Sequence, residues 1–270
     1  LIELGPGKCS LIKDILRVGK LKKQFTNSMY LNLIEKNHQL IKLQKKILNK
    51  IKIKQPTWGK NFEINNNLPS IIYSNEFFDC FPIRQFYKKE KWFEKYIFYN
   101  SANDLFSFIS KEVKNRSLIN SLKKFDKYKI AEISISRKKY FDRICKFIKK
   151  NKGLILTIDY GYKEPLNQFS LQTTYKHKKT HLFENLGNQD ITTYVNFDEL
   201  ISVAKNNRLN IDLYCTQKDF LISFGINKRK NKLKMNQNQN IKNKIDFDYK
   251  RLTEDSQMGK DFKVLVVSCI

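Results

Sequence analysis

The chain has 270 residues, of which 41% are hydrophobic and 13% aromatic, enough apolar material for one large or two small packed domains. No apolar run approaches the roughly 18 residues that a membrane-spanning helix requires, which excludes a transmembrane protein. Lys and Arg number 52 against 26 Asp and Glu, a net charge of +26. Because the lysines are spread over almost every segment, this charge indicates a general compositional bias, and we expect no dedicated nucleic-acid surface.

The cysteine pattern indicates the redox compartment of the protein, and the first residues indicate whether the sequence includes the natural N-terminus. The five cysteines are odd in number and include no C-x-x-C pair, so neither a disulfide framework nor a zinc or other metal site is expected. A reducing compartment follows, namely the bacterial cytoplasm or, as an alternative, the mitochondrial matrix. The chain begins with Leu1 inside an apolar stretch, and we expect that the N-terminal part of the natural protein is missing.

Short apolar runs alternate with helical patterns along most of the chain. This alternation predicts an α/β fold with a doubly wound, mostly parallel, Rossmann-like sheet, in which ligands bind at the carboxyl ends of the strands. The final apolar run, 263–269, is expected to form the edge or last strand of the sheet. The predicted strands are 1–4, 30–34, 71–74, 154–158, 209–214 and 263–269, and helices are predicted after Ser10, after Asn37, from 135 to 150 and after Asn196.

Three segments interrupt this pattern within what we expect to be a single domain, 1–270. Residues 83–98 contain two aromatic and β-branched runs around a Lys-Glu turn, which predicts an inserted hairpin. Residues 163–193 are polar and without periodicity, which is typical of a functional lid loop. Residues 227–250 are rich in Lys and Asn, and we interpret them as a solvated low-complexity insertion.

The turn after the first strand reads Glu3-Leu4-Gly5-Pro6-Gly7. Glycines allow close approach of the backbone to a ligand, and the following helix offers unpaired N–H groups. The position of the third glycine in the dinucleotide fingerprint holds Ser10, so a pyrophosphate site is not indicated. The Glu3 carboxylate suits a ligand with an ammonium group. The alternative is a tight strand-helix turn with no ligand.

Glu35 lies at the end of the second predicted strand. A carboxylate there can accept hydrogen bonds from both hydroxyls of a ribose. Glu3, the glycine turn and Glu35 together fit a nucleoside that carries an amino acid, and S-adenosylmethionine is the common ligand of that kind. The alternative for Glu35 is an exposed carboxylate with no ligand.

The string Asn75-Glu76-Phe77-Phe78-Asp79 ends the strand expected beside the first. Methyl transfer from a sulfonium needs alignment of the nucleophile and removal of its proton, which carboxylates and an amide can provide. We therefore predict Asn75, Glu76 and Asp79 as catalytic residues. For an arginine acceptor, Glu76 and Asp79 could orient the guanidinium. Phe77 is predicted to stack on the substrate, with a place in the core as the alternative.

Further substrate contacts are expected elsewhere on the chain. Asp159 and Tyr160 end another predicted strand at the same edge, where a solvated strand end is the alternative. His177 lies in the predicted lid loop, where a structural or surface role is the alternative.

Several motifs resemble the MidA family of class I methyltransferases, which includes a mitochondrial complex I assembly factor that methylates an arginine. The resemblance runs over essentially the whole chain, and Asn-Glu-Phe-Phe-Asp is its most specific part. The motifs are Glu3-Leu4-Gly5-Pro6-Gly7, Asn75-Glu76-Phe77-Phe78-Asp79-Cys80-Phe81-Pro82, Asp159-Tyr160-Gly161-Tyr162, Asp190-Ile191-Thr192 and Gln257-Met258-Gly259-x-x-Phe262-Lys263-Val264-Leu265.

The resemblance implies a Rossmann-like methyltransferase with an inserted hairpin and a lid, S-adenosylmethionine as cofactor, and a protein arginine as acceptor, on a respiratory complex I subunit or a similar protein. A noncatalytic assembly factor and a nucleic-acid methyltransferase are the alternatives. The implied cofactor contacts are Glu3, Gly5, Pro6, Gly7, Glu35 and Asn75, and the implied acceptor site comprises Asn75, Glu76 and Asp79, with Asp190 as a further substrate contact.

Overall fold

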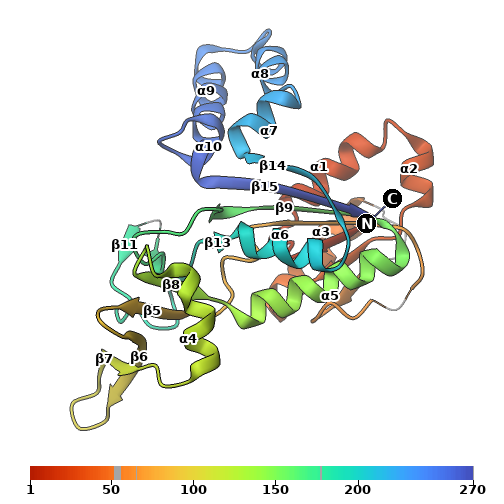
Figure 1. Cartoon of the computed structure of the whole chain (residues 1–270). Helices are drawn as coiled ribbons and strands as arrows, with labels where there is room; N and C mark the ends of the chain where they lie inside the picture. The colour runs from red at the N-terminus through yellow and green to blue at the C-terminus, as the bar shows by residue number, and fades with distance from the viewer. Residues whose placement is uncertain (52–55, 65, 177, 270) are drawn as a thin grey trace. The chain divides into compact units, whose positions relative to one another are not determined.

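The computed structural model describes residues 1–51, 56–64, 66–176 and 178–269 (Figure 1). The chain forms two compact units. Unit 1 comprises Leu1–Phe77, Tyr140–Asp159 and Leu200–Ile270, and unit 2 comprises Phe78–Lys139 and Tyr160–Glu199. The expectation of a single domain did not distinguish these two units.

The central sheet of unit 1 has the strand order β14-β15-β9-β4-β1-β2-β3. The pairs β1–β2, β1–β4, β2–β3 and β4–β9 are parallel, whereas β14 and β15 are antiparallel. The predicted mostly parallel α/β sheet is thus confirmed, and the third predicted strand does lie beside the first. The strands are β1 (Ile2–Leu4), β2 (Asn32–Ile34), β3 (Thr57–Gly59), β4 (Ser70–Asn75), β9 (Gly153–Tyr162), β14 (Asn210–Thr216) and β15 (Phe262–Cys269).

Two details of the sheet differ from the expectation. β3, which contains Trp58, is a three-residue edge strand that was not predicted, because so short a segment carries no periodic signal. β15 is the last strand of the chain, as one alternative of the expectation had it, but it lies between β14 and β9 and is therefore not an edge strand. Its burial pattern agrees with this, since five of its eight residues are buried and the other three are partly buried.

Helices pack on the sheet through apolar stripes. On α1, Ile12 and Leu16 are buried in a cluster with Leu33 of β2 and Tyr73 of β4. Each buried side chain of this size contributes roughly 1.5–3 kcal/mol relative to exposure. Asn207, just after α6, donates to Asp142 of α5 at 2.8 Å, and the two helices run beside each other in Figure 1. The helices are α1 (Ser10–Gly19), α2 (Lys23–Ser28), α3 (His38–Ile51), α5 (Ile135–Asn151) and α6 (Phe197–Asn206).

The segment between β14 and β15 is helical, including the Lys/Asn-rich stretch that was expected to be a solvated insertion. Tyr249 donates to Asn227 at 2.7 Å, and Lys234 pairs with Asp246 at 2.6 Å, so polar contacts join α8 and α9. Within α8 no residue is buried, so this helix is indeed well solvated. The helices are α7 (Gln217–Ser223), α8 (Ile226–Lys234), α9 (Gln239–Thr253) and α10 (Met258–Asp261), grouped together in Figure 1. Among the described residues, none of these or the other helices is long and apolar enough to cross a membrane.

Unit 2 contains an antiparallel sheet of strand order β7-β6-β5-β8. The predicted hairpin 83–98 corresponds to β5 and β6, which pair with each other, and β7 and β8 extend the sheet on either side. Phe86, Trp92 and Phe125 are central to its buried core. The elements are β5 (Arg84–Lys88), β6 (Trp92–Asn100), β7 (Leu105–Glu112), α4 (Arg116–Leu122), the 3-10 helix η1 (Lys123–Phe125) and β8 (Ile130–Ile133).

The predicted lid loop contains a small antiparallel sheet of strand order β11-β10-β12. Thr173 of β10 donates its hydroxyl to the Thr180 carbonyl of β11 at 2.6 Å. The alternating side chains here are mostly polar, which explains why hydrophobic periodicity did not reveal the strands. The strands are β10 (Gln172–Tyr175), β11 (Lys178–Thr180) and β12 (Asp190–Thr192), and a further short strand, β13 (Val195–Asn196), pairs with β9.

Candidate functional site

The turn between β1 and α1 holds three residues in the left-handed region. Gly5, Gly7 and Cys9 have φ of +64°, +50° and +59°. A Cβ at Gly5 would lie 2.9 Å from the Phe77 ring, whereas a Cβ at Gly7 would have no atom of the described residues within 4 Å. Pro6 is buried and accepts a hydrogen bond from the Cys9 N–H at 2.8 Å. Gly5 is therefore needed for packing, and Gly7 presents bare backbone to open space.

Glu3 on β1 is 4% exposed, and its Oε2 has no hydrogen-bond partner among the described residues. Its register partner on β4 is Tyr73. Burial raises the pKa of Glu3 to about 7, and the Tyr73 hydroxyl offsets part of this shift. A buried carboxylate oxygen without a partner is costly, and an ammonium group from a ligand would satisfy it.

The cysteine of the turn is not a candidate nucleophile. Burial, with the nearby Glu3 carboxylate as the next cause, raises the pKa of Cys9 to about 11. The thiol therefore stays protonated at neutral pH.

Glu35 follows β2 and is held in place on both carboxylate oxygens. Oε1 accepts from the Asn37 N–H at 3.0 Å, and Oε2 accepts from Gln44 Nε2 at 3.2 Å. Each oxygen can accept a second hydrogen bond, so the half-buried carboxylate remains able to bind hydroxyl donors.

Gln44 is a site residue that the sequence analysis missed. It is fully buried on α3, donates to the Gly7 carbonyl at 2.9 Å as well as to Glu35, and accepts from Trp58 Nε1 at 3.0 Å. One side chain thus joins the glycine turn, the acid after β2 and the edge strand β3. The available signal was a polar residue four positions before Leu48 on the apolar stripe of α3.

Asn75 and Glu76 lie at the carboxyl end of β4. The residue that follows them, Phe77, packs its ring against Gly5 of the glycine turn. Asn75 Nδ2 donates to Glu76 Oε1 at 3.2 Å, and Glu76 itself has a left-handed φ of +50°. Its N–H donates to the Ile158 carbonyl at 3.0 Å. Both side chains are exposed, so they can reach a bound reactant.

Asp159 supports this string from β9. It is fully buried, and its Oδ2 accepts from the Phe77 N–H at 3.1 Å. The Phe77 ring lies 5.4 Å from the Tyr140 ring. The observed contact gives Asp159 a positioning role in the string, and its predicted substrate contact stays a prediction, as does that of Phe77.

The second half of the string belongs to unit 2. Asp79 is 5% exposed, and its carbonyl accepts from the Thr193 N–H at 3.0 Å. Arg137, which is buried, donates to the Phe78 carbonyl and to the Thr193 hydroxyl, both at 2.8 Å. This guanidinium anchors residues 78–79 to the segment around β12 and was not predicted.

The other predicted substrate contacts lie in unit 2 or outside the residues that the structure describes. Tyr160 stacks on Tyr194, with ring centroids 6.3 Å apart. Asp190 is exposed at the start of β12, where its backbone pairs with Thr174. His177 lies outside the described residues. Unit 1 therefore brings together Glu3, Gly5, Pro6, Gly7, Glu35, Asn75, Glu76, Phe77 and Asp159, while Asp79, Tyr160 and Asp190 are in unit 2.

The chain is similar to several known proteins. It is 30% identical over 254 residues to the mitochondrial protein arginine methyltransferase NDUFAF7 homolog of Caenorhabditis elegans, covering 86% of this chain but only 59% of the relative's length. It is 24% identical to the mitochondrial protein arginine methyltransferase NDUFAF7 of Danio rerio, covering 99% of this chain and 68% of that protein.

Among solved structures, a Burkholderia thailandensis protein bound to S-adenosyl-homocysteine superposes with a TM-score of 0.86 at 20% identity, covering 99% of this chain and 70% of that one. This likeness supports the class I fold. The family model described as "Putative S-adenosyl-L-methionine-dependent methyltransferase" matches residues 1–215. With a match over most of its length, the chain belongs to this family of class I methyltransferases, the MidA family.

Proposed function

We propose that this chain carries the catalytic site of an S-adenosylmethionine-dependent methyltransferase that acts on a protein arginine. The observation that carries the proposal is the buried Glu3 oxygen, which has no hydrogen-bond partner among the described residues, on the strand that leads into the open backbone at Gly7. The family to which the chain belongs and the printed names of its relatives support the same activity.

The residues of unit 1 fit this cofactor in their chemistry. The Glu3 carboxylate would pair with the ammonium of the methionine part, the bare Gly7 backbone would leave room for close approach, and the Glu35 oxygens would accept from the ribose hydroxyls. Gln44 would hold Glu35 and the turn at a constant spacing, because it bonds both. Little rearrangement is then needed on binding, which lowers its entropic cost.

The acceptor chemistry rests on Asn75 and Glu76. When bound, the cofactor supplies a methyl group on a sulfonium, and transfer breaks the carbon–sulfur bond, leaves the electron pair on sulfur and forms a carbon–nitrogen bond. The acceptor nitrogen then carries an excess proton, which the exposed Glu76 carboxylate would accept. Asn75 would hold Glu76 in position through its 3.2 Å hydrogen bond. A guanidinium is a very weak acid that keeps its protons at neutral pH, so the transfer needs a base at this position.

The identity of the protein that carries the arginine stays a prediction, and so does its assignment to a subunit of respiratory complex I. The compartment in which the chain acts also stays a prediction. Two relatives are named as mitochondrial proteins, which supports the mitochondrial alternative.

The test has a binding arm and a transfer arm. Calorimetry should detect S-adenosyl-homocysteine binding to the chain, weakened by about 1–3 kcal/mol in Glu35→Ala and unchanged in the exposed neighbour variant Lys36→Ala. Incubation with cofactor labelled on the methyl group and a host lysate should place label on arginine after acid hydrolysis. Absence of binding would overturn the proposal. Binding without any labelled product would favour a noncatalytic assembly factor. Label on nucleic acid would show that the acceptor is a nucleic acid and not a protein arginine.

A further inference from the structure

A two-part cleft lies entirely within unit 2. Its parts are cavities of about 330 and 410 Å³ that share the lining residues Lys95 and Phe108. The larger cavity is bordered by the chain from Asp79 to Ile83, which continues the predicted acceptor string. The smaller one reaches His181 and the end of β11. Their combined size suits several consecutive residues of an extended peptide rather than a single small group.

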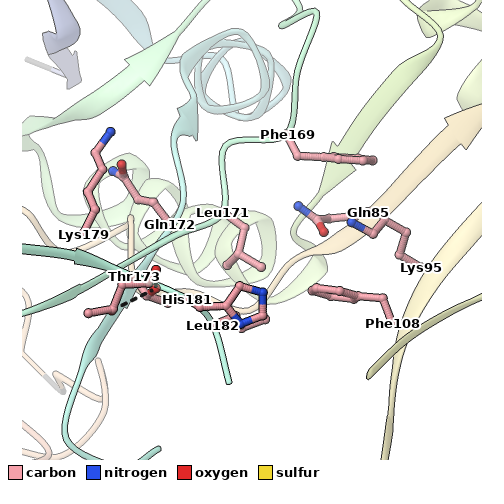
Figure 2. A pocket seen from close by; sticks show the side chains of 11 residues that line it. Gln85, Lys95, Phe108, Phe169, Leu171, Gln172, Thr173, Lys179, His181 and Leu182 are labelled. Carbon is pink, nitrogen blue, oxygen red and sulfur yellow. Dashed lines mark hydrogen bonds between the residues drawn. The ribbon is translucent and has the colours of Figure 1, made fainter. Parts of the chain in front are cut away.

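Lys95 of β6 stands where the two cavities meet. Its ammonium lies 4.3 Å from the centroid of the Phe108 ring and 4.6 Å from that of Phe169, and Figure 2 shows the nitrogen between the two rings. The residue is half-buried, and no carboxylate within the described parts of the chain forms an ion pair with it. The rings hold the cation and remove part of its hydration, which strengthens its attraction for an anion.

The charges along the cleft differ at its two ends. In the smaller cavity the ionisable lining residues are Lys95, Lys179 and His181, and no Asp or Glu of the described chain lines it. In the larger cavity Asp79 provides a carboxylic acid. An occupant that matches the smaller cavity therefore carries a negative charge toward Lys95.

We propose that this cleft binds an extended segment of the protein substrate through an acidic side chain, Asp or Glu, whose carboxylate pairs with Lys95 between Phe108 and Phe169. The role of the segment as substrate rests on the proposed function, whereas the carboxylate site itself does not. A single ammonium between two rings matches a monoanion. A phosphate, with its larger charge, is typically held by bidentate arginines, and the smaller cavity has none among its described lining residues. The cleft thus favours protein segments that carry an acidic residue.

The test measures peptide binding directly. Fluorescein-labelled peptides of about a dozen residues carry a central arginine in an Ala/Leu background, and one Glu is moved through the positions on either side, each with a matched Gln peptide. Because an extended chain advances about 3.3 Å per residue, this scan samples the length of the cleft. Anisotropy with the whole chain should show one Glu position that binds about tenfold more tightly than its Gln counterpart, with the preference reduced by added salt.

Variants assign the preference to Lys95. Lys95→Met retains an unbranched apolar side chain between the rings and loses the charge, so the Glu preference should fall below about twofold. Lys95→Gln should behave alike, and circular dichroism should show both variants folded. Lys89→Met removes an exposed lysine of the same sheet's β5–β6 turn, which does not line the cleft, and should keep the preference.

The outcomes separate the two proposals. Equal binding of Glu and Gln peptides at every position, or a preference that survives in Lys95→Met, would overturn the carboxylate site. Tighter binding of a phosphoserine peptide than of the Glu peptide would also reject it in favour of a phosphate site. If the Glu peptide binds through Lys95 but its arginine is never methylated, the cleft stands and the proposed acceptor fails.

Discussion

Glu3 and Tyr73 lie opposite each other on the parallel strands β1 and β4, and both side chains are buried. Neither Glu3 Oε2 nor the Tyr73 hydroxyl meets a partner at full hydrogen-bond geometry among the described residues, but the two side chains lie close enough that each shifts the pKa of the other. Burial raises the pKa of Tyr73 far above its usual value, and the Glu3 charge adds to that rise. The sheet therefore holds a carboxyl group beneath the glycine turn that is poorly solvated until a cation reaches it.

The raised pKa of Glu3 predicts a specific dependence of stability on pH. Its pKa is about 7 in the folded chain against an ordinary value of 4.5, so between these values the folded state keeps a proton that the unfolded state has lost. The free energy of unfolding should therefore fall as pH rises through this window, by roughly 3 kcal/mol in total. Glu3→Gln should remove that fall and be the more stable protein at pH 8.

Urea denaturation at intervals from pH 4.5 to 8 measures this effect as the difference between the parent chain and the variant. Glu63→Gln, which changes an exposed carboxylate of unit 1, is the matched control and should retain the slope because Glu3 is intact. Parallel stability profiles for the parent chain and Glu3→Gln would show that Glu3 does not hold a proton at neutral pH.

The two glycines of the turn should respond differently to the same substitution. Gly5→Ala combines a left-handed φ with a Cβ only 2.9 Å from the Phe77 ring, so it should cost about 2 kcal/mol or more in stability. Gly7→Ala meets no atom of the described residues and should cost only about 1 kcal/mol from backbone strain. Its methyl group would instead project into the space offered to the cofactor. Thermal unfolding and calorimetry with S-adenosyl-homocysteine compare them, and a Gly7→Ala variant that binds normally would remove Gly7 from the site.

Gln44 should be needed for both stability and cofactor binding. Gln44→Leu keeps the buried volume but leaves the Trp58 N–H, the Gly7 carbonyl and one Glu35 oxygen without their hydrogen bonds. The expected loss is about 3 kcal/mol in the free energy of unfolding, together with weaker S-adenosyl-homocysteine binding. Gln39→Leu changes an exposed glutamine of the same helix and should alter neither. Full cofactor affinity in Gln44→Leu would contradict its role in setting the spacing of the turn and Glu35.

Glu76→Gln should separate binding from transfer. The amide keeps the size of the side chain and can still accept a hydrogen bond from Asn75, but it cannot take a proton, so methyl transfer should fall about a hundredfold or more. Affinity for S-adenosyl-homocysteine should change little. Single-turnover assays with saturating labelled cofactor measure the transfer step, and undiminished product formation would exclude Glu76 as the proton acceptor.

Hydrophobic patterning was sufficient for the parallel part of the fold because each of those elements has a stripe or run of apolar residues in its own sequence. β1, β2, β4, β9 and the helices α1, α3 and α5 were predicted within a few residues. It was insufficient for β10 to β12, whose side chains are largely polar, and for α8 and α9, whose Lys/Asn composition is typical of a disordered segment. Polar contacts such as Lys234–Asp246 join these two helices in the structure.

The same distinction holds for the site. Glu3 lies within the first apolar strand, Gly5 and Gly7 come shortly after it, and Glu35 directly follows the second. Because parallel strands end at one edge of the sheet, the neighbourhood of these residues could be predicted from position alone. Gln44 is nine residues from Glu35 and 37 from Gly7, and only the packing of α3 brings its amide to both. Lys95 likewise gains its two aromatic neighbours from β7 and from residue 169, which lie far from it along the chain. The local sequence determines which strand ends carry chemistry, whereas the contacts that hold and tune those groups depend on burial between distant segments, which only the tertiary structure decides.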